Sequence, residues 1–317
     1  MNIGTDIQRA VDALRANDVV GIPTETVYGL SANALNDQAV MNIFATKNRP
    51  SFNPLILHTN SLEKVEDFVK EFPPQAKQLA KKFWPGPLTL LLPKSDIVPD
   101  AVTSGSPLVA VRVPDHLLTL SLLEQLDFPL AAPSANKFGR ISPTDAQAVY
   151  HQLGDEVAYI LDGGDCGVGI ESTIIGFEND EPIIYRVGGL SVEMIEAEIG
   201  LVSVNAKSHE RPKTSGMLKS HYAPETPFHV GDIPSLLKKF EGHKIAVVSF
   251  QKEYQEQNNF VLTPTGDLEE AARNLFKFMN KLDALEVDVI LAEYVPNEGL
   301  GRGVNDRLQR ADYKNKS

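Results

Sequence analysis

Residues 1 to about 200 alternate short apolar runs with helical stretches, and this alternation constrains the fold more than any other feature of the chain. Strands that alternate with helices are typical of α/β proteins, in which the helices cover a central sheet. The chain has 317 residues, of which 42% are hydrophobic, so about two domains can each bury a core. We therefore predict an α/β fold with more than one domain.

The helices and strands of this first part follow from periodicity, capping residues and helix breakers. A helix is expected at residues 6–17 with Thr5 as its N-cap, and the helix at 75–84 is stopped by a Pro-Gly-Pro sequence. The other expected helices are at residues 37–46, 116–125 and 144–153. The expected strands are residues 19–23, residues 55–58 and the runs LTLLL, VAVRV, PLAAP, AYILD, STIIGF and IIYRV.

The alternation fails in the polar stretch that follows, which contains Pro, Gly and basic residues and has no clear period. We interpret residues 201–226 as a linker between a first domain, residues 1–200, and a second domain, residues 227–317. A linker of this length is either disordered or functional. The tight cluster HYAP, at residues 221–224, favours a function.

The second domain shows the same alternation on a smaller scale. Strands are expected at residues 244–250 and in the run DVILAEY, and residues 267–282 form an amphipathic helix. A Gly-rich segment, NEGLGRG, precedes a further helix at about residues 305–310. This order predicts a small parallel sheet with Rossmann-like winding.

The charge balance limits the ligands that the chain can bind. Its net charge is -12 and its pI is about 5.1, which makes it a poor general nucleic-acid binder. An anionic ligand must then meet a local cationic site. The single cysteine, Cys166, excludes an intrachain disulfide. Since the sequence also lacks a signal peptide and any apolar run of about 18 residues, we expect a cytoplasmic protein.

Several common motifs are missing from the sequence. It contains no P-loop, no GxGxxG, no HExxH and no pair of cysteines. We therefore expect no metal held by the protein itself, and any ATP must be bound by another arrangement. The absence of a GxSxG elbow also argues against an α/β-hydrolase.

Polar and charged residues gather instead at the ends of the expected strands, where sites are usually built. The hydroxyls of Thr24, Thr26 and Tyr28 suit a small polar ligand, although a turn and a capped helix explain the same residues. Lys47 and Arg49 follow a helix, where cations are favourable anyway.

Beside Asn53, these two cations also suit a triphosphate. His58 ends an apolar strand, where a histidine at the edge of the core is the simplest explanation. Arg112 lies inside an apolar strand, so it either extends to solvent or faces an anion such as a carboxylate. Further polar groups follow later strands or begin them: Ser134, Asn136, Ser142, Ser172 and Arg186.

Together these segments closely resemble the YrdC-like domain of threonylcarbamoyl-AMP synthases, over residues 1 to about 195. The linker and tail segments SGMLKSHYAPETP and EGLGRGVNDRLQRA resemble the two-domain form of the family. One departure is TSGM, where the family's linker usually reads closer to SPGM. The matching strings of the first domain are PTETVYGLSANA, the K-x-R of Lys47 and Arg49 with NPL and His58, FWPGPLTLLL, VAVRVP, PSAN, DGG, ESTII and YRVGG.

The resemblance implies a twisted mixed α/β sheet with a concave, locally positive cavity, followed by a smaller Rossmann-like domain. It implies a nucleotidyltransferase that condenses L-threonine, bicarbonate and ATP to threonylcarbamoyl-AMP and pyrophosphate, with Mg²⁺ held largely by phosphate oxygens and water. Partner proteins then transfer the threonylcarbamoyl group to adenosine in tRNA. Matched motif by motif, the resemblance implies that L-threonine is bound by Thr26, His58, Arg112 and Ser172. It implies that ATP is bound by Arg49, Asn53, Ser134, Asn136, Ser142, Arg186 and Tyr222. The residues that it implies for catalysis are Lys47 and Arg49.

In this interpretation Tyr222 folds over the nucleotide as a lid that excludes water. No general base is evident, so orientation and cationic stabilisation of the leaving pyrophosphate are expected to carry the rate. Two other functions are open. One is a non-catalytic module that binds structured RNA, which the acidic charge argues against. The other is a carbamoyl-transfer maturation enzyme, which normally carries Cys pairs and acylphosphatase segments that are absent from this sequence.

Overall fold

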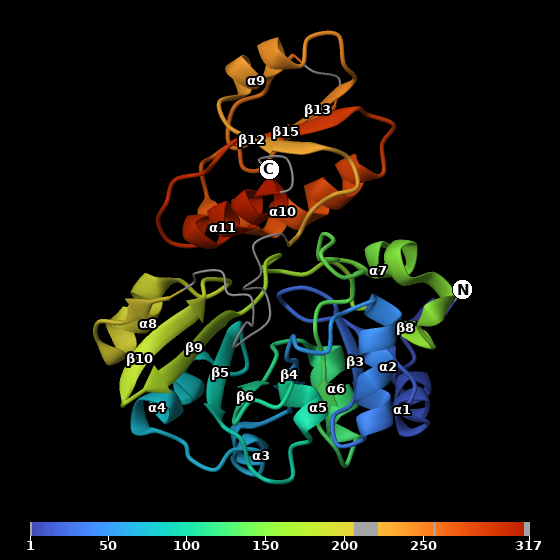
Figure 1. Cartoon of the computed structure of the whole chain (residues 1–317), viewed down its shortest axis with the longest axis vertical. Coiled ribbons are helices and arrows are strands. Elements are labelled where there is room, and N and C mark those ends of the chain that lie inside the picture. Colours follow the sequence, from blue (N-terminus) through green and yellow to red (C-terminus); the bar gives the residue numbers. More distant parts are fainter. Residues whose placement is uncertain (1, 206–220, 256–257, 314–317) are drawn as a thin grey trace.

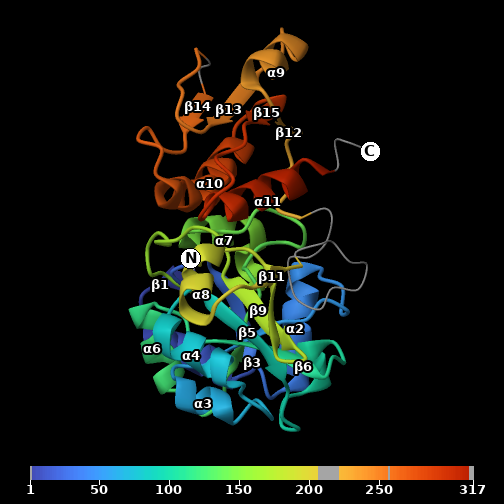
Figure 2. The same ribbon diagram turned by 90° about the vertical axis from the view of Figure 1, so that its left-hand side faces the viewer.

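The computed structural model describes residues 2–205, 221–255 and 258–313, and it contains two sheets that are covered by helices (Figures 1 and 2). The larger sheet is mixed and the smaller one is entirely parallel. Both views place the smaller unit at one end of the larger one, with helices α10 and α11 on the side that faces it. The predicted fold class, a mixed α/β sheet followed by a smaller parallel one, is therefore confirmed.

The larger sheet has 11 strands in the order β1-β8-β2-β3-β7-β4-β6-β5-β9-β10-β11. Its central strand β4 pairs in parallel with β6 and antiparallel with β7. The strands are β1 (Ile3–Gly4), β2 (Val20–Ile22), β3 (Gly29–Asn33), β4 (Ile56–His58), β5 (Leu88–Pro93), β6 (Leu108–Arg112), β7 (Leu130–Ala131), β8 (Tyr159–Leu161), β9 (Thr173–Glu178), β10 (Glu181–Arg186) and β11 (Ser203–Val204).

Five helices of the first unit, α1, α2, α3, α7 and α8, begin at polar capping residues, whose side chains accept a backbone N–H of the first turn. The predicted cap Thr5 is wrong, because Asp6 caps α1 and accepts from the backbone N–H of Arg9 at 3.2 Å. The helices are α1 (Ile7–Arg15), α2 (Asp37–Lys47), α3 (Leu62–Glu66), α4 (Pro74–Phe83), α5 (Asp100–Thr103), α6 (Leu117–Glu124), α7 (Ala146–Leu153), the 3₁₀ turn η1 (Gly154–Glu156) and α8 (Val192–Ile199).

The segment after β2 forms a turn that leads into a strand and not into a helix. Thr24 Oγ1 accepts the backbone N–H groups of Thr26 and Val27, both at 3.2 Å, and lies 2.8 Å from Thr26 Oγ1. The chain then enters β3, which pairs antiparallel with β2. A helix is thus absent from this point, and the threonine hydroxyls hold a tight, buried turn.

The smaller sheet has the order β12-β15-β13-β14, and all of its pairs are parallel. Apolar residues of α10 and α11 cover one face and those of α9 pack against the other. The elements are β12 (Phe228–Val230), α9 (Ile233–Lys239), β13 (Ile245–Ser249), β14 (Asn258–Val261), α10 (Leu268–Asp283), β15 (Val289–Ala292) and α11 (Gly301–Ala311).

The two units share a hydrophobic core. Val27, Ile141 and Ile170 of the first unit belong to the same buried cluster as Phe276 of α10 and Val304 of α11. Burial of apolar surface across this contact stabilises the arrangement of the two units, at roughly 25 cal/mol for each Å². The contact brings α11 close to the loops that precede β9 and follow β10.

The described residues bear on two expectations, the lack of a membrane span and the linker between the domains. No helix among the described residues is long and apolar enough to span a membrane. Most of the predicted linker, residues 206–220 with the TSGM sequence, lies outside the described residues. Residues 221–226 are described, and they include the buried Tyr222.

Candidate functional site

A cavity lies at the ends of several strands of the larger sheet. His58 and Arg112 are the last residues of the parallel strands β4 and β6, and they are paired in register. Parallel strands bring their carboxyl ends to one edge, which is how these side chains meet. The cavity is lined by Thr24, Thr26, Val27, Gly29, Arg49, Ile56, His58, Arg112, Ala132, Pro133, Ser134, Glu171, Ser172, Arg186, His221 and Tyr222.

Arg112 is buried and faces this cavity, so it does not extend to solvent. Its Nη1 donates to Thr26 Oγ1 at 2.9 Å, and its Nε donates to the carbonyl of Gly86 at 3.2 Å. Its Nη2 lies 2.7 Å from Glu25 Oε1. These contacts fix the plane of the guanidinium, which is the geometry needed to bind a carboxylate through two N–H groups.

His58 lies beside Arg112 and is neutral at physiological pH. The pKa of its imidazole is lowered to about 3, chiefly by burial and then by the nearby charge of Arg112. Its Nδ1 lies 3.1 Å from the carbonyl oxygen of Ile56. The ring is therefore an uncharged polar wall of the cavity, and it adds no charge of its own to the field of Arg112.

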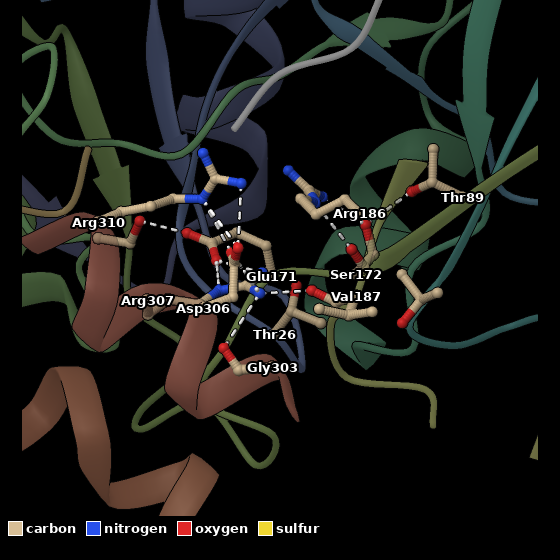
Figure 3. A network of polar contacts seen from close by, with 12 residues as sticks. Thr26, Thr89, Glu171, Ser172, Arg186, Val187, Gly303, Asp306, Arg307 and Arg310 are labelled. Atoms are coloured by element: carbon tan, nitrogen blue, oxygen red, sulfur yellow. Dashed lines mark hydrogen bonds and ion pairs between the residues drawn. The ribbon is translucent and has the colours of Figure 1, made fainter. Parts of the chain in front are cut away.

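Ser172 connects two of the predicted groups of residues. Its Oγ lies 2.7 Å from Thr89 Oγ1 and accepts from Arg186 Nη2 at 3.0 Å. Arg186 Nε also donates to the backbone carbonyl of Ser172 at 2.9 Å. The last residue of β10 and the residue before β9 are thus joined at the cavity (Figure 3).

Arg49 follows α2 and reaches the cavity from another side. Its Nε and Nη2 donate to the carbonyls of Asn53 and Pro54, at 3.1 and 3.0 Å. The side chain of Asn53 is fully buried but does not line the cavity, and neither its Nδ2 nor its Oδ1 has a hydrogen-bond partner among the described residues. Buried amide groups are normally satisfied, so Asn53 has hydrogen-bonding capacity left.

Lys47, Asn136 and Ser142 are buried just outside the lining of the cavity. The ammonium of Lys47 donates to the backbone carbonyls of Ser134 and Asn136. Its pKa lies well below the usual lysine range, because burial and then the charge of Arg49 disfavour the ammonium. Asn136 Nδ2 donates to the carbonyls of Lys137 and Arg140, at 2.8 and 2.9 Å. Lys47 and Asn136 thus support the loop that carries Ser134.

The structure adds a carboxylate and an arginine that the sequence reasoning did not assign. Glu171 lines the cavity, and its Oε1 accepts from Ser142 Oγ at 2.5 Å. Its Oε2 accepts from Nε and Nη2 of Arg307 at 3.1 and 3.0 Å. Arg307 belongs to α11 of the second unit (Figure 3). Glu171 and Arg307 lie 136 positions apart in the sequence. No local sequence pattern therefore indicated that they pair.

Tyr222 and His221 close the other side of the cavity. The two rings are 4.2 Å apart between centroids, and Tyr222 also lies 5.3 Å from the ring of Phe276 in α10. The guanidinium carbon of Arg307 is 5.5 Å from the centroid of the Tyr222 ring, within the range of a cation–π contact. Tyr222 is therefore held by the second unit while facing the cavity.

Cations that repel one another gather around this cavity. The pKa of Arg49 is lowered to about 9, chiefly by burial and then by the charge of Arg186. The pKa of Arg186 is lowered to about 10, also chiefly by burial. Several buried positive charges near one cavity are unfavourable until an anion joins them, so the electrostatics favour a multiply charged anionic ligand.

The side chains around the cavity do not form a metal site of their own among the described residues. No group of three or more His, Cys, Asp or Glu side chains is placed to hold a metal within the part of the chain that the structure describes. Both oxygens of Glu171 are already bonded, to Ser142 and to Arg307. A divalent ion at this cavity would arrive with phosphate oxygens and water as its ligands.

The structure therefore brings most of the predicted residues into one place. Four of the predicted residues pack directly behind the lining of the cavity or at its edge: Lys47, Asn53, Asn136 and Ser142. The predicted residues that line it are Thr26, Arg49, His58, Arg112, Ser134, Ser172, Arg186 and Tyr222.

Two family models match the chain in succession. The model described as "Telomere recombination" matches residues 12–188, and "Threonylcarbamoyl-AMP synthase, C-terminal domain" matches residues 190–312. The chain is 44% identical to the threonylcarbamoyl-AMP synthase of Pyrococcus abyssi, over 96% of this chain and 93% of that protein. It is 40% identical to the threonylcarbamoyl-AMP synthase of Bacillus subtilis, over 96% and 92% of the two chains.

Solved structures give the same relationship. The crystal structure of P. abyssi Sua5 complexed with L-threonine matches with a TM-score of 0.91 and 43% identity, over 96% of this chain and 94% of that chain. E. coli YciO matches with a TM-score of 0.52 and 23% identity, over 59% and 93%, which indicates a shared fold. On these findings the chain belongs to the threonylcarbamoyl-AMP synthase family, in the form that carries the C-terminal domain.

Proposed function

We propose that this chain condenses L-threonine, bicarbonate and MgATP to threonylcarbamoyl-AMP and pyrophosphate in the cavity at the ends of β4 and β6. The observation that carries the proposal is the gathering of the buried cations Arg49, Arg112 and Arg186 around one cavity in an acidic chain. The substrates are anionic at their carboxylate, bicarbonate and triphosphate groups, so each can neutralise part of this charge.

L-Threonine binds at the end of the cavity formed by Thr26, His58, Arg112 and Ser172. The fixed guanidinium of Arg112 receives the carboxylate, and the hydroxyls of Thr26 and Ser172 and the neutral ring of His58 supply hydrogen bonds. Thr26 Oγ1 already accepts from Arg112 Nη1, so one substrate can contact both groups. This arrangement fixes the amino group in one orientation for attack.

MgATP binds towards Arg49, Ser134 and Arg186, with Tyr222 over the nucleotide. Lys47 and Arg49 are the groups assigned to catalysis: Arg49 stabilises the leaving pyrophosphate by its charge, and Lys47 fixes the loop that carries Ser134. Lys47, Asn53, Asn136 and Ser142 act partly by holding the loops that carry these contacts. Mg²⁺ enters as part of the substrate and takes its ligands mainly from phosphate and water.

The reaction then proceeds by positioning. The neutral amino group of threonine attacks the carbon of bicarbonate, and loss of water gives the N-carboxylate. One oxygen of this carbamate attacks the α-phosphorus in line, and the bond to pyrophosphate breaks. Arg49 and Arg186 stabilise the charge that develops on the leaving group. Tyr222 restricts water, which would hydrolyse the adenylate.

Residues 1–200 form the catalytic domain in this proposal, residues 201–226 connect the domains, and residues 227–317 form the Rossmann-like domain. The product passes to other proteins that transfer its threonylcarbamoyl group to adenosine in tRNA. Binding of structured RNA without catalysis is the alternative, and the acidic net charge of -12 argues against it.

The deciding experiment supplies MgATP, L-threonine and bicarbonate to the purified protein and measures pyrophosphate together with a new adenylate by mass spectrometry. We expect an adenylate that requires all three substrates and contains carbon from labelled bicarbonate. Well-folded protein that forms no adenylate under these conditions would contradict the proposal, and binding of structured RNA would then be measured next.

A further inference from the structure

Arg307 is a buried cation that the second unit inserts into the first. Its side chain is completely buried, although it lies on α11, which belongs to the smaller unit. Two of its nitrogens bond to Glu171 Oε2, at 3.1 and 3.0 Å, and Nη1 donates to the carbonyls of Val187 and Gly303. Figure 3 shows the guanidinium directed from α11 towards Glu171.

Glu171 is held from both sides by these contacts. Its Oε1 accepts from Ser142 Oγ at 2.5 Å, so each oxygen of the carboxylate has a partner. Burial by itself would raise the pKa of Glu171, but Arg307, Arg186 and the Ser142 hydroxyl together keep that pKa below its usual range. The carboxylate is therefore ionised, buried and fixed in one orientation.

This fixed carboxylate lies among the cations that face the cavity. Among the described residues of the lining, Glu171 is the one carboxylate, and Arg49 and Arg186 line the same cavity. An ionised carboxylate that lost its partner would be costly to keep buried, and Arg186, whose charge already acts on the Glu171 carboxylate, is the most favourable replacement. A released Glu171 would thus pair with Arg186 and oppose a phosphate group there.

Arg307 also contacts the aromatic wall of the cavity. Its guanidinium carbon lies 5.5 Å from the centroid of the Tyr222 ring, and Asp306 Oδ2 lies 3.6 Å from its Nη1. A single side chain of α11 therefore touches both Glu171 and Tyr222. These two residues lie on the side of the cavity that is assigned to the nucleotide.

We propose that Arg307 is a positioning residue through which the second domain keeps Glu171 away from the phosphate-binding arginines and so sets the affinity for MgATP. The proposal rests on the proposed function in assigning this side of the cavity to the triphosphate. It gives the second domain a specific part in catalysis by the first. Arg307 itself reaches the substrates only through Glu171 and Tyr222.

The test measures the dissociation constant of a non-hydrolysable MgATP analogue by calorimetry, and the KM values for ATP and L-threonine in the synthesis assay. In Arg307→Met, we expect the ATP constants to rise by at least about tenfold, as for a broken buried charge pair, and the threonine KM to change by less than about threefold. Adding Glu171→Gln to this variant should recover most of the loss, because the competing carboxylate is then gone.

Arg302→Met is the matched control. Arg302 also lies on α11 and also forms an ion pair with the first unit, to Glu193 at 2.8 Å, but this pair is partly exposed and does not line the cavity. We expect its ATP constants to equal those of the wild type. A similar loss in Arg302→Met would mean that any contact between the units matters and would overturn the specific role of Arg307.

Rescue separates positioning from a structural role. If Arg307 only maintained the fold, the ATP constants would follow the free energy of unfolding from variant to variant, and that result would overturn the proposal. If Arg307→Met does not fold, Arg307→Gln, which removes the charge but keeps a hydrogen-bonding group, is compared with and without Glu171→Gln in the same way. Wild-type protein that binds the analogue but makes no adenylate would contradict the proposed function while the calorimetric comparison still tests Arg307.

Discussion

Arg112 and Glu25 form an ion pair beside the cavity, with Nη2 of the arginine 2.7 Å from Oε1 of the glutamate. These two atoms make no hydrogen bond of normal geometry among the described residues, although both are buried. Each therefore retains hydrogen-bonding capacity. A cation and an anion held side by side in this way suit the two ends of an amino acid, its carboxylate and its amino group.

Replacing Arg112 by alanine should weaken the binding of L-threonine and leave the binding of ATP nearly unchanged. Loss of a charge-assisted contact to the carboxylate is worth about 1.5–3 kcal/mol, so the threonine KM should rise by about tenfold or more. The KM for ATP should change by less than about twofold, and steady-state kinetics with each substrate varied in turn measure both. Arg140→Ala removes a more exposed Arg–Glu pair with Glu225 and should alter neither constant. An equal loss for both substrates would argue against the threonine assignment.

Glu25→Gln tests the amino end of the same subsite. The wild type should bind L-threonine more tightly than the matching hydroxy acid, which has a hydroxyl in place of the amino group. In Glu25→Gln this preference should shrink severalfold, because a neutral amide attracts the amino group less. Competition assays with the two ligands measure the ratio. An unchanged ratio would show that Glu25 only orients Arg112.

Lys47→Met should destabilise the fold as well as impair ATP use. The variant leaves the carbonyls of Ser134 and Asn136 without the ammonium that now binds them. Each buried carbonyl left unsatisfied costs about 1–3 kcal/mol, so the free energy of unfolding should fall by a few kcal/mol. Lys137→Met is the control, because Lys137 forms a partly exposed pair with Glu156. Unchanged stability in Lys47→Met would contradict this supporting role.

Stability should fall as the pH is lowered below about 6.5. The pKa of His58 and that of His221 are both lowered to about 3 in the folded protein, chiefly by burial. Between about pH 3 and the unfolded value near 6.5, the unfolded chain binds protons that the folded chain does not. The stabilisation is thus complete above pH 6.5 and is lost towards pH 3.

When the pH is lowered from 7.5 to 5, the free energy of unfolding should fall by roughly 2 kcal/mol for each of these two histidines. Denaturant titrations at the two pH values measure the difference. In His58→Gln and in His221→Gln the free energy of unfolding should depend less on pH, because each variant lacks the contribution of one buried histidine. A pH dependence equal to that of the wild type would contradict the burial of a neutral ring at that position.

Gly169→Ala tests the contact between the two units. Gly169 has φ +80°, and an added Cβ would lie 2.4 Å from the Cα of Arg273 in α10. Gly164 in the same loop has φ +78° and has nothing within 4 Å of such a Cβ, so Gly164→Ala carries the backbone strain alone, about 1 kcal/mol. We expect Gly169→Ala to be clearly less stable than Gly164→Ala and to bind ATP more weakly. Equal stability of the two variants would show that the units separate at little cost.

Local patterns in the sequence predicted the regular elements well. The amphipathic helix expected at residues 267–282 is α10 (Leu268–Asp283), and the strand expected at 244–250 contains β13 (Ile245–Ser249). Strong periodicity and clear caps specify such segments without reference to the rest of the chain. The strand β3, which begins at the end of PTETVYGL, was harder to predict, because its residues Gly29–Asn33 include glycine, serine and asparagine and no β-branched or aromatic residue.

The candidate site was predictable where a family motif carried it, as at Arg49, Arg112 and Arg186. The structure shows that these residues line one cavity, while their individual roles stay predictions. Glu171 and Arg307 were not predicted, because a buried ion pair between two domains leaves no periodic or local trace. Only the approach of α11 to the loop before β9 brings them together.

The pairing of Glu171 with Arg307 also restricts how such chains can evolve. Either charge alone, buried without its counterpart, is strongly unfavourable, so a substitution at one position should be followed by a substitution at the other. A shortened relative that ended before α11 would retain the catalytic cavity but would have no cation at this point. In such a lineage we expect a neutral residue in place of Glu171, so that loss of the second domain and loss of this carboxylate would be inherited together.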